Sequence, residues 1–157
     1  MKLAEALHLR ADLQKRMNQL QQRLLNNAKV QEGDEPAENP DYLISELKKC
    51  SKSFENLVAQ INLTNSQPVC DGCTLTELIA KKDAATLYLN QMRTFLNAAS
   101  NKVDRYSNKE ILVKSTVDVK ALQAELDNEA KALRELDMKI QSLNWTIDLM
   151  EKSEGAL

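Results

Sequence analysis

The sequence has few of the residues that interrupt helices or build sheets. Its 157 residues include only 3 glycines and 3 prolines, and aromatic residues make up 4%. A β-sandwich or a barrel needs more turn residues and more aromatic and β-branched strand formers. A glycine-rich phosphate loop could hardly be built from so few glycines. Since the length suits one domain, we expect a single all-α domain over residues 1–157.

The sequence also lacks a stripe of one-signed charge and a long apolar run. The formal net charge is −2, and the basic pairs Lys48-Lys49 and Lys81-Lys82 have the acidic neighbours Glu46 and Asp83. A surface that follows nucleic-acid phosphates needs a positive stripe, so we expect no nucleic-acid partner. No run approaches the ~20 apolar residues of a membrane span, and residues 1–20 hold no region like a signal peptide. We therefore expect no membrane span and a cytoplasmic location.

Metal-ligating and nucleophilic residues are scarce, with 3 cysteines and 1 histidine. An odd number of cysteines in an unsecreted chain argues against a disulfide framework. Cys70 and Cys73 have the spacing of half a zinc site or of a redox pair. A structural zinc needs about four ligands, and only Cys50 and His8 remain, so zinc shared between two chains is the version worth testing. We expect no cofactor, and no acid–base or nucleophile pattern favours an enzyme.

Four segments repeat apolar residues at alternating steps of three and four, which is typical of helices that pack along a narrow apolar stripe, here called the seam. They predict helices over about residues 2–28, 40–65, 75–102 and 118–152. The seam of the second segment consists of Leu43, Leu47, Cys50, Phe54, Leu57 and Ile61. Residues 30–39 and 66–73 are predicted connections, and residues 104–117 are the least helical part.

Capping signals indicate where several of these helices begin and end. Asn39-Pro40 is a good helix start, because asparagine can cap and proline at the first position loses no useful N–H. Thr74 and Glu77 have the spacing of a capping box. Asp118 is a plausible cap for the last helix, and Gly155 is expected to end it.

Such long helices need a partner for most of their length, since isolated helices gain little stability in water. Short connections make consecutive helices antiparallel. Two arrangements fit: an up-down four-helix bundle, or two coiled-coil-like helical hairpins that pack by oligomerising. A seam period near 3.5 residues predicts left-handed packing in either case. We expect a homo-oligomer formed through helix faces.

Several stretches along nearly the whole chain carry a resemblance to known proteins. They are residues 1–40, INLTNS at 61–66, TLTELIAKKD at 74–83, DRYSNKEI at 104–111, STVDVKALQ at 115–123 and ELDMKIQSLNW at 135–145. These stretches are similar to a bacterial family of small uncharacterised helical proteins, some of which are named septicolysin. The resemblance implies a helical fold and no established activity; the name suggests a cytolysin. Where the family pattern has a cysteine-free turn, this chain has Cys70 and Cys73.

Charged residues interrupt two of the seams, at Arg10 in the first segment and Lys82 in the third. In an up-down bundle both would lie about nine residues from the same end. Burying either without a partner is costly, so each would need water, a bound anion or a carboxylate. We expect a polar layer that either fixes the helix register or binds a small anion or ligand. Its members would be Arg10, Asn62, Asn65, Lys82, Asn144 and Trp145, with Glu5, Glu77 and Asp148 as candidate carboxylate partners.

At the other end of such a bundle, the segment 32–38, here called the acidic loop, would face Arg105, Lys109 and Lys114. The two loops could simply pair with each other, and surface ion pairs of this kind stabilise little. They could also form a surface for a protein partner. Taken together, the sequence favours a non-enzymatic structural or interaction protein that self-associates. The alternatives are a small-anion or ligand-binding bundle around Arg10 and Lys82, and a cytolysin.

Overall fold

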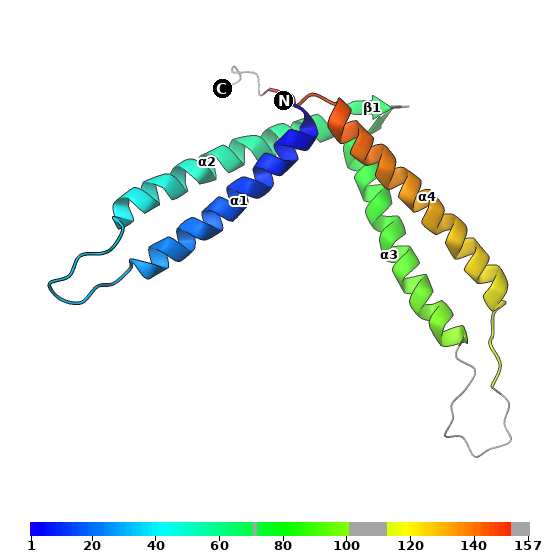
Figure 1. Cartoon of the computed structure of the whole chain (residues 1–157). Helices are drawn as coiled ribbons and strands as arrows, with labels where there is room; N and C mark the ends of the chain where they lie inside the picture. The colour runs from blue at the N-terminus through cyan, green and yellow to red at the C-terminus, as the bar shows by residue number, and fades with distance from the viewer. Residues whose placement is uncertain (71, 101–112, 152–157) are drawn as a thin grey trace, which may run out of the picture. The chain divides into compact units, whose positions relative to one another are not determined.

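Four long helices and one very small sheet make up the computed structural model, which describes residues 1–70, 72–100 and 113–151 (Figure 1). The expected all-α fold class is confirmed. The helices are α1 (Leu3–Asn26), α2 (Pro40–Asn65), α3 (Leu75–Ser100) and α4 (Val119–Thr146). The two strands, β1 (Pro68–Cys70) and β2 (Cys73–Thr74), pair with each other.

The chain divides into two compact units. The first consists of Met1–Pro68 together with Leu143–Leu157, of which the structure describes residues up to 151. The second consists of Val69–Ser142. The first therefore contains the hairpin of α1 and α2, and the second contains α3 and most of α4. That the whole chain forms one domain stays a prediction.

In the first unit, α1 and α2 lie side by side (Figure 1) and share a core along their seams. Leu43 is fully buried, and Cys50, which lies on the same predicted seam, is also buried. Arg10 is the exception on the α1 seam, because its side chain is exposed. The buried members of this core are Leu20, Leu43 and Cys50, with Met17, Leu24 and Leu47 packed against them.

In the second unit, α3 and α4 contact each other through apolar residues spaced by three and four along each helix. The buried members are Leu89, Leu96, Leu126 and Ala130, and Met92, Val119, Leu122 and Leu133 pack against them. The pair α1 and α2 and the pair α3 and α4 are thus helical hairpins, each with a core of its own. Left-handed supercoiling of these hairpins stays a prediction.

The capping signals in the sequence place three helix starts correctly. The Asn39 side chain accepts hydrogen bonds from the amides of Asp41 (2.8 Å) and Tyr42 (3.4 Å) at the start of α2. At the start of α3, the Thr74 amide donates to Glu77 (2.7 Å) and the Glu77 amide donates to the Thr74 hydroxyl (3.1 Å). At the start of α4, the Asp118 side chain accepts a hydrogen bond from the Ala121 amide at 3.0 Å. Each cap satisfies amides that would otherwise lack a partner in the first turn.

The connections agree with the sequence except for one small addition. Residues 27–39 form an irregular loop, which includes the connection predicted over residues 30–39. The predicted connection over 66–73 contains the paired strands β1 and β2, with Gly72 at a φ of +76° between them. That backbone conformation costs glycine little. Residues 113–117 are neither helix nor strand, and the rest of the segment 104–117 lies outside the described residues.

The predicted end of the last helix was wrong. The apolar spacing continues through Ile147 and Met150, which suggested a helix to about residue 152, but α4 ends at Thr146. The next residues are extended and pair with the start of the chain: the Leu3 amide donates to the Ile147 carbonyl at 3.0 Å, and the Leu149 amide donates to the Met1 carbonyl at 2.9 Å. This pairing supplies the hydrogen bonds that a longer helix would have made. Gly155, the expected helix stop, lies outside the described residues.

The other helix limits differ from the predicted ones by at most two residues. α1 spans Leu3–Asn26 where residues 2–28 were predicted, and α3 ends at Ser100 where about 102 was predicted. Asn27 explains the first difference, because its side chain donates to the Arg23 carbonyl at 2.9 Å and accepts from the Glu38 amide at 3.0 Å. It therefore fixes the end of α1 and the returning chain to each other.

Candidate functional site

The strongest candidate site is a groove between α3 and α4 in the second unit. Lys82 occupies a seam position of α3, and its ammonium group lies 2.7 Å from a carboxylate oxygen of Asp137 on α4. The two side chains are 34% and 45% exposed, so the pair is half-buried. The groove has a volume of about 440 Å³. It is lined by Lys82, Thr86, Leu133, Arg134, Asp137 and Met138.

The charges in this groove do not cancel. Lys82 and Asp137 neutralise each other, whereas no acidic group among the described residues lies within ion-pair distance of Arg134. The guanidinium group of arginine offers planar donors that match a carboxylate or a phosphate. Leu133 and Met138 supply apolar walls beside it. The arrangement can hold a small anion that also carries an apolar part; it offers no nucleophile–base pair.

Lys82 pairs with a residue that the sequence did not single out. Glu5, Glu77 and Asp148 were the expected carboxylates, but Lys82 binds Asp137. Glu77 is instead held by Thr74, whose backbone amide and hydroxyl donate to it and lower the pKa of the Glu77 carboxyl. The periodicity of α3 reveals that Lys82 faces α4, but it does not reveal which residue of α4 lies opposite.

The remaining two carboxylates lie in the first unit, close to the start of the chain. The backbone amide of Lys2 donates to Glu5 at 2.7 Å. The Lys2 ammonium lies 2.9 Å from Asp148 and also donates to the Thr146 carbonyl at 3.0 Å. The hydrogen bond from Lys2 lowers the pKa of the Asp148 carboxyl. These groups therefore hold the two extended ends of the first unit together.

The predicted members of the polar layer are divided between the two units. Lys82 belongs to the second unit, and Arg10, Asn62, Asn65, Asn144 and Trp145 belong to the first. Arg10, Asn62 and Trp145 are exposed, whereas Asn65 and Asn144 are half-buried. The ring of Trp145 lies 6.4 Å from that of His8, tilted by 45°. A single polar layer that joins all six residues stays a prediction.

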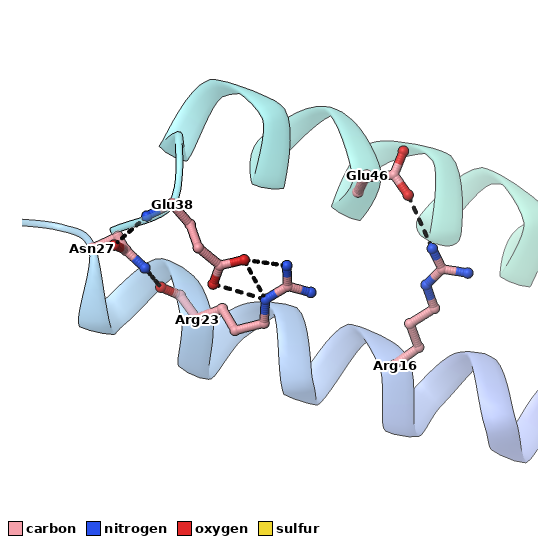
Figure 2. Close-up of polar contacts among 5 residues, drawn as sticks. All are labelled: Arg16, Arg23, Asn27, Glu38 and Glu46. Carbon is pink, nitrogen blue, oxygen red and sulfur yellow. Dashed lines mark hydrogen bonds and ion pairs between the residues drawn. The ribbon is translucent and has the colours of Figure 1, made fainter. Parts of the chain in front are cut away.

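Polar contacts in the first unit bind the acidic loop to α1 (Figure 2). Glu38 forms an ion pair with Arg23, whose guanidinium group donates hydrogen bonds to it. These hydrogen bonds lower the pKa of the Glu38 carboxyl. Two turns before Arg23 along α1, Arg16 donates to Glu46 of α2 at 3.0 Å, as Figure 2 shows. Of the basic residues expected to face this loop, Arg105 and Lys109 lie outside the described residues.

Most of the chain matches one family model, over residues 10–149, described as a family of unknown function (DUF6847). The chain belongs to that family. It is also similar to a crystal structure described as that of a functionally unknown conserved protein from Corynebacterium diphtheriae. The two sequences are 38% identical, and the similarity covers 96% of this chain and 99% of that chain, with a TM-score of 0.81. No curated protein matches.

The similarity to the crystal structure supports the helical fold, and the description of the DUF6847 family supplies no activity. The family match includes both walls of the Lys82 groove, since it extends from residue 10 to residue 149. Among the helices that the structure describes, none is both long enough and apolar enough to cross a membrane. The resemblance to septicolysin stays a prediction.

The two cysteines of the β hairpin, Cys70 and Cys73, are half-buried free thiols. A zinc site would need further ligands close to them. Within residues 1–70, 72–100 and 113–151, no group of three or more histidine, cysteine or acidic side chains is placed to hold a metal ion. A zinc ion shared between two chains stays a prediction.

Proposed function

We propose that this member of the DUF6847 family is a cytoplasmic helical interaction protein, without enzymatic activity, that self-associates through helix faces left uncovered in a single copy. A helical hairpin has one seam, so each helix can bury only one side against its neighbour. The opposite sides must be polar or must be covered by something else. The composition of those opposite sides is the observation that carries the proposal.

Large apolar side chains are exposed on both helices of the second unit. On α3, Leu87 is 61% exposed, Tyr88 43% and Phe95 44%, and on α4 Met138 is 70% exposed. Single exposed apolar residues are normal. Tyr88 and Phe95, however, lie two turns apart on the same side of α3. Groups of exposed apolar and aromatic side chains are typical of interaction surfaces.

The first unit has the same character. Its described residues expose Leu9 of α1 and, on α2, Tyr42, Ile44 and Leu63, each by more than a third. Tyr42 combines an apolar ring with a polar hydroxyl, which suits a surface that is covered in an assembly and exposed to solvent in a single copy. The two units therefore support the same proposal independently.

Sedimentation velocity of the full chain tests this proposal. We expect the mass of two or more chains at high concentration and a decrease towards the mass of one chain over about a hundredfold dilution, because association follows mass action. The mass of a single chain at every concentration would contradict self-association.

A second candidate function, binding of a small anion with an apolar part, is favoured by Arg134 in the Lys82 groove. We expect decanoate to raise the melting temperature of the protein, because a ligand that binds the folded state stabilises it. The rise should be smaller for Arg134→Gln, which removes the charge and keeps a polar side chain at this position. Arg93→Gln, which removes a charge from α3 outside the groove lining, is the matched control. Equal shifts in all three proteins would exclude Arg134 as the anion's partner.

The cytolysin activity that the septicolysin resemblance suggests is a third candidate. Release of dye from liposomes would check it.

A further inference from the structure

A second and smaller groove runs between α3 and α4, with a volume of about 220 Å³. It lies on the other side of the hairpin from the Lys82 groove. Leu133 contributes to both, but Ala132 lines only the smaller groove and Arg134 only the larger one. Residues two apart point about 200° apart around a helix. The smaller groove is lined by Lys81, Ala85, Glu129, Ala132, Leu133 and Leu136.

The two charges of the smaller groove lie at its opposite ends. Lys82 pairs with Asp137, which fixes the level at which the antiparallel helices meet. Lys81 is therefore close to the level of Asp137, whereas Glu129 lies eight residues earlier on α4. At 1.5 Å per residue, about 12 Å separates the two charges along the hairpin. The residues between them are apolar, and two are alanines.

Lys81 and Glu129 are both exposed. Among the residues that the structure describes, no opposite charge lies within ion-pair distance of either side chain. Glu129 directly precedes Ala130, the buried residue between Leu126 and Leu133 on the α4 seam, so it lies at the edge of that seam. A carboxylate at the edge of a seam needs a partner once that edge is covered.

We propose that a second copy of this chain docks antiparallel on the smaller groove, so that Lys81 of each copy pairs with Glu129 of the partner subunit. A two-fold axis across the hairpin reverses its direction and brings the basic end of one groove to the acidic end of the other. Parallel docking would instead place the two Lys81 side chains at the same end. This inference rests on the proposed self-association and names its surface.

The arrangement of the two charges favours a second copy of this chain over a partner whose surface is only acidic or only basic. An acidic partner would meet Glu129, and a basic partner would meet Lys81, and like charges that face each other across an interface are costly. A copy of the same surface satisfies both ends. The alanines allow the helices to approach closely, and the exposed ring of Tyr88, one turn from Ala85 on α3, adds apolar surface beside the groove.

Charge reversal at both ends of the smaller groove tests this arrangement. Lys81→Glu and Glu129→Lys should each weaken association about tenfold, because a dimer contains the affected pair twice and each exposed pair is worth up to about 1 kcal/mol. The double variant Lys81→Glu/Glu129→Lys should restore the wild-type affinity. Within one chain the two residues are too far apart to pair, so the rescue requires a second copy. Sedimentation equilibrium measures all four affinities.

Lys48→Glu, which changes the charge equally at an exposed position of α2, is the matched control and should keep the wild-type affinity. Circular dichroism establishes that each variant is folded. If the wild type associates and neither single variant is weakened, this docking surface is wrong although self-association stands. If the singles are weakened and the double is not restored, the antiparallel pairing is wrong. If the wild type never associates, both proposals fail.

Discussion

Leu43→Ala is expected to lower the free energy of unfolding by about 3 kcal/mol, the typical cost of removing a buried leucine side chain beyond its Cβ and leaving a cavity. Leu43 is fully buried, and it packs with Leu20 and Cys50 in the core between α1 and α2. A two-helix core has few layers, so neighbouring side chains have little freedom to fill the space. Since domains of this size are stable by about 5–15 kcal/mol, the loss is large.

Urea unfolding followed by circular dichroism measures this loss. The experiment is done at one fixed, low protein concentration, because self-association would add stability that depends on concentration. Leu25→Ala is the matched control: it removes the same atoms from α1 at a position that is 62% exposed. We expect it to change the free energy of unfolding by less than about 0.5 kcal/mol. Equal losses in the two variants would show that Leu43 is not in the core.

Local signals in the sequence were sufficient to predict the helices. The spacing of Leu43 and Cys50 predicts that both face α1, and both are buried. The starts of α2, α3 and α4 follow from Asn39, Thr74 and Asp118, because a cap involves only residues two or three positions apart. These features depend on neighbours in the chain, so the sequence contains all the information they need.

Features that depend on distant parts of the chain could not be predicted in this way. The apolar period continues past Thr146, but Ile147 and Leu149 form hydrogen bonds to residues at the start of the chain, which no local pattern reveals. The strands β1 and β2 have three and two residues, too few for an alternating pattern to be recognised.

The candidate site shows the same limit. The sequence identified Lys82 as a charged residue on a seam, and the structure adds its partner Asp137 and the neighbouring Arg134. To find these two residues, one must know the register of α4 against α3. A seam period fixes the side of a helix that faces its neighbour, but any shift by a whole heptad preserves that side. Leu89 and Ala130 lie in the same core, but the sequence holds no signal that aligns α3 with α4.

A large loss in the free energy of unfolding is also expected from a substitution at Thr64, where α2 contacts the segment that follows α4. Thr64 is 1% exposed. Its hydroxyl donates to the Gln60 carbonyl at 2.7 Å and accepts from the Met150 amide at 3.0 Å. The hydroxyl therefore belongs to the same set of contacts as the pairing of Ile147 and Leu149 with the start of the chain.

Thr64→Val keeps the shape of the side chain but removes both hydrogen bonds, which leaves the Met150 amide without its acceptor. We expect a loss of about 1–2 kcal/mol in the free energy of unfolding, together with faster hydrogen exchange at the Met150 amide, measured by NMR. Thr94→Val is the matched control, because the Thr94 hydroxyl is exposed and donates only to the Asn90 carbonyl of its own helix. That variant should leave both measurements close to the wild type. Unchanged exchange at Met150 in Thr64→Val would mean that the hydroxyl does not hold this segment, because no other change in the variant protects that amide.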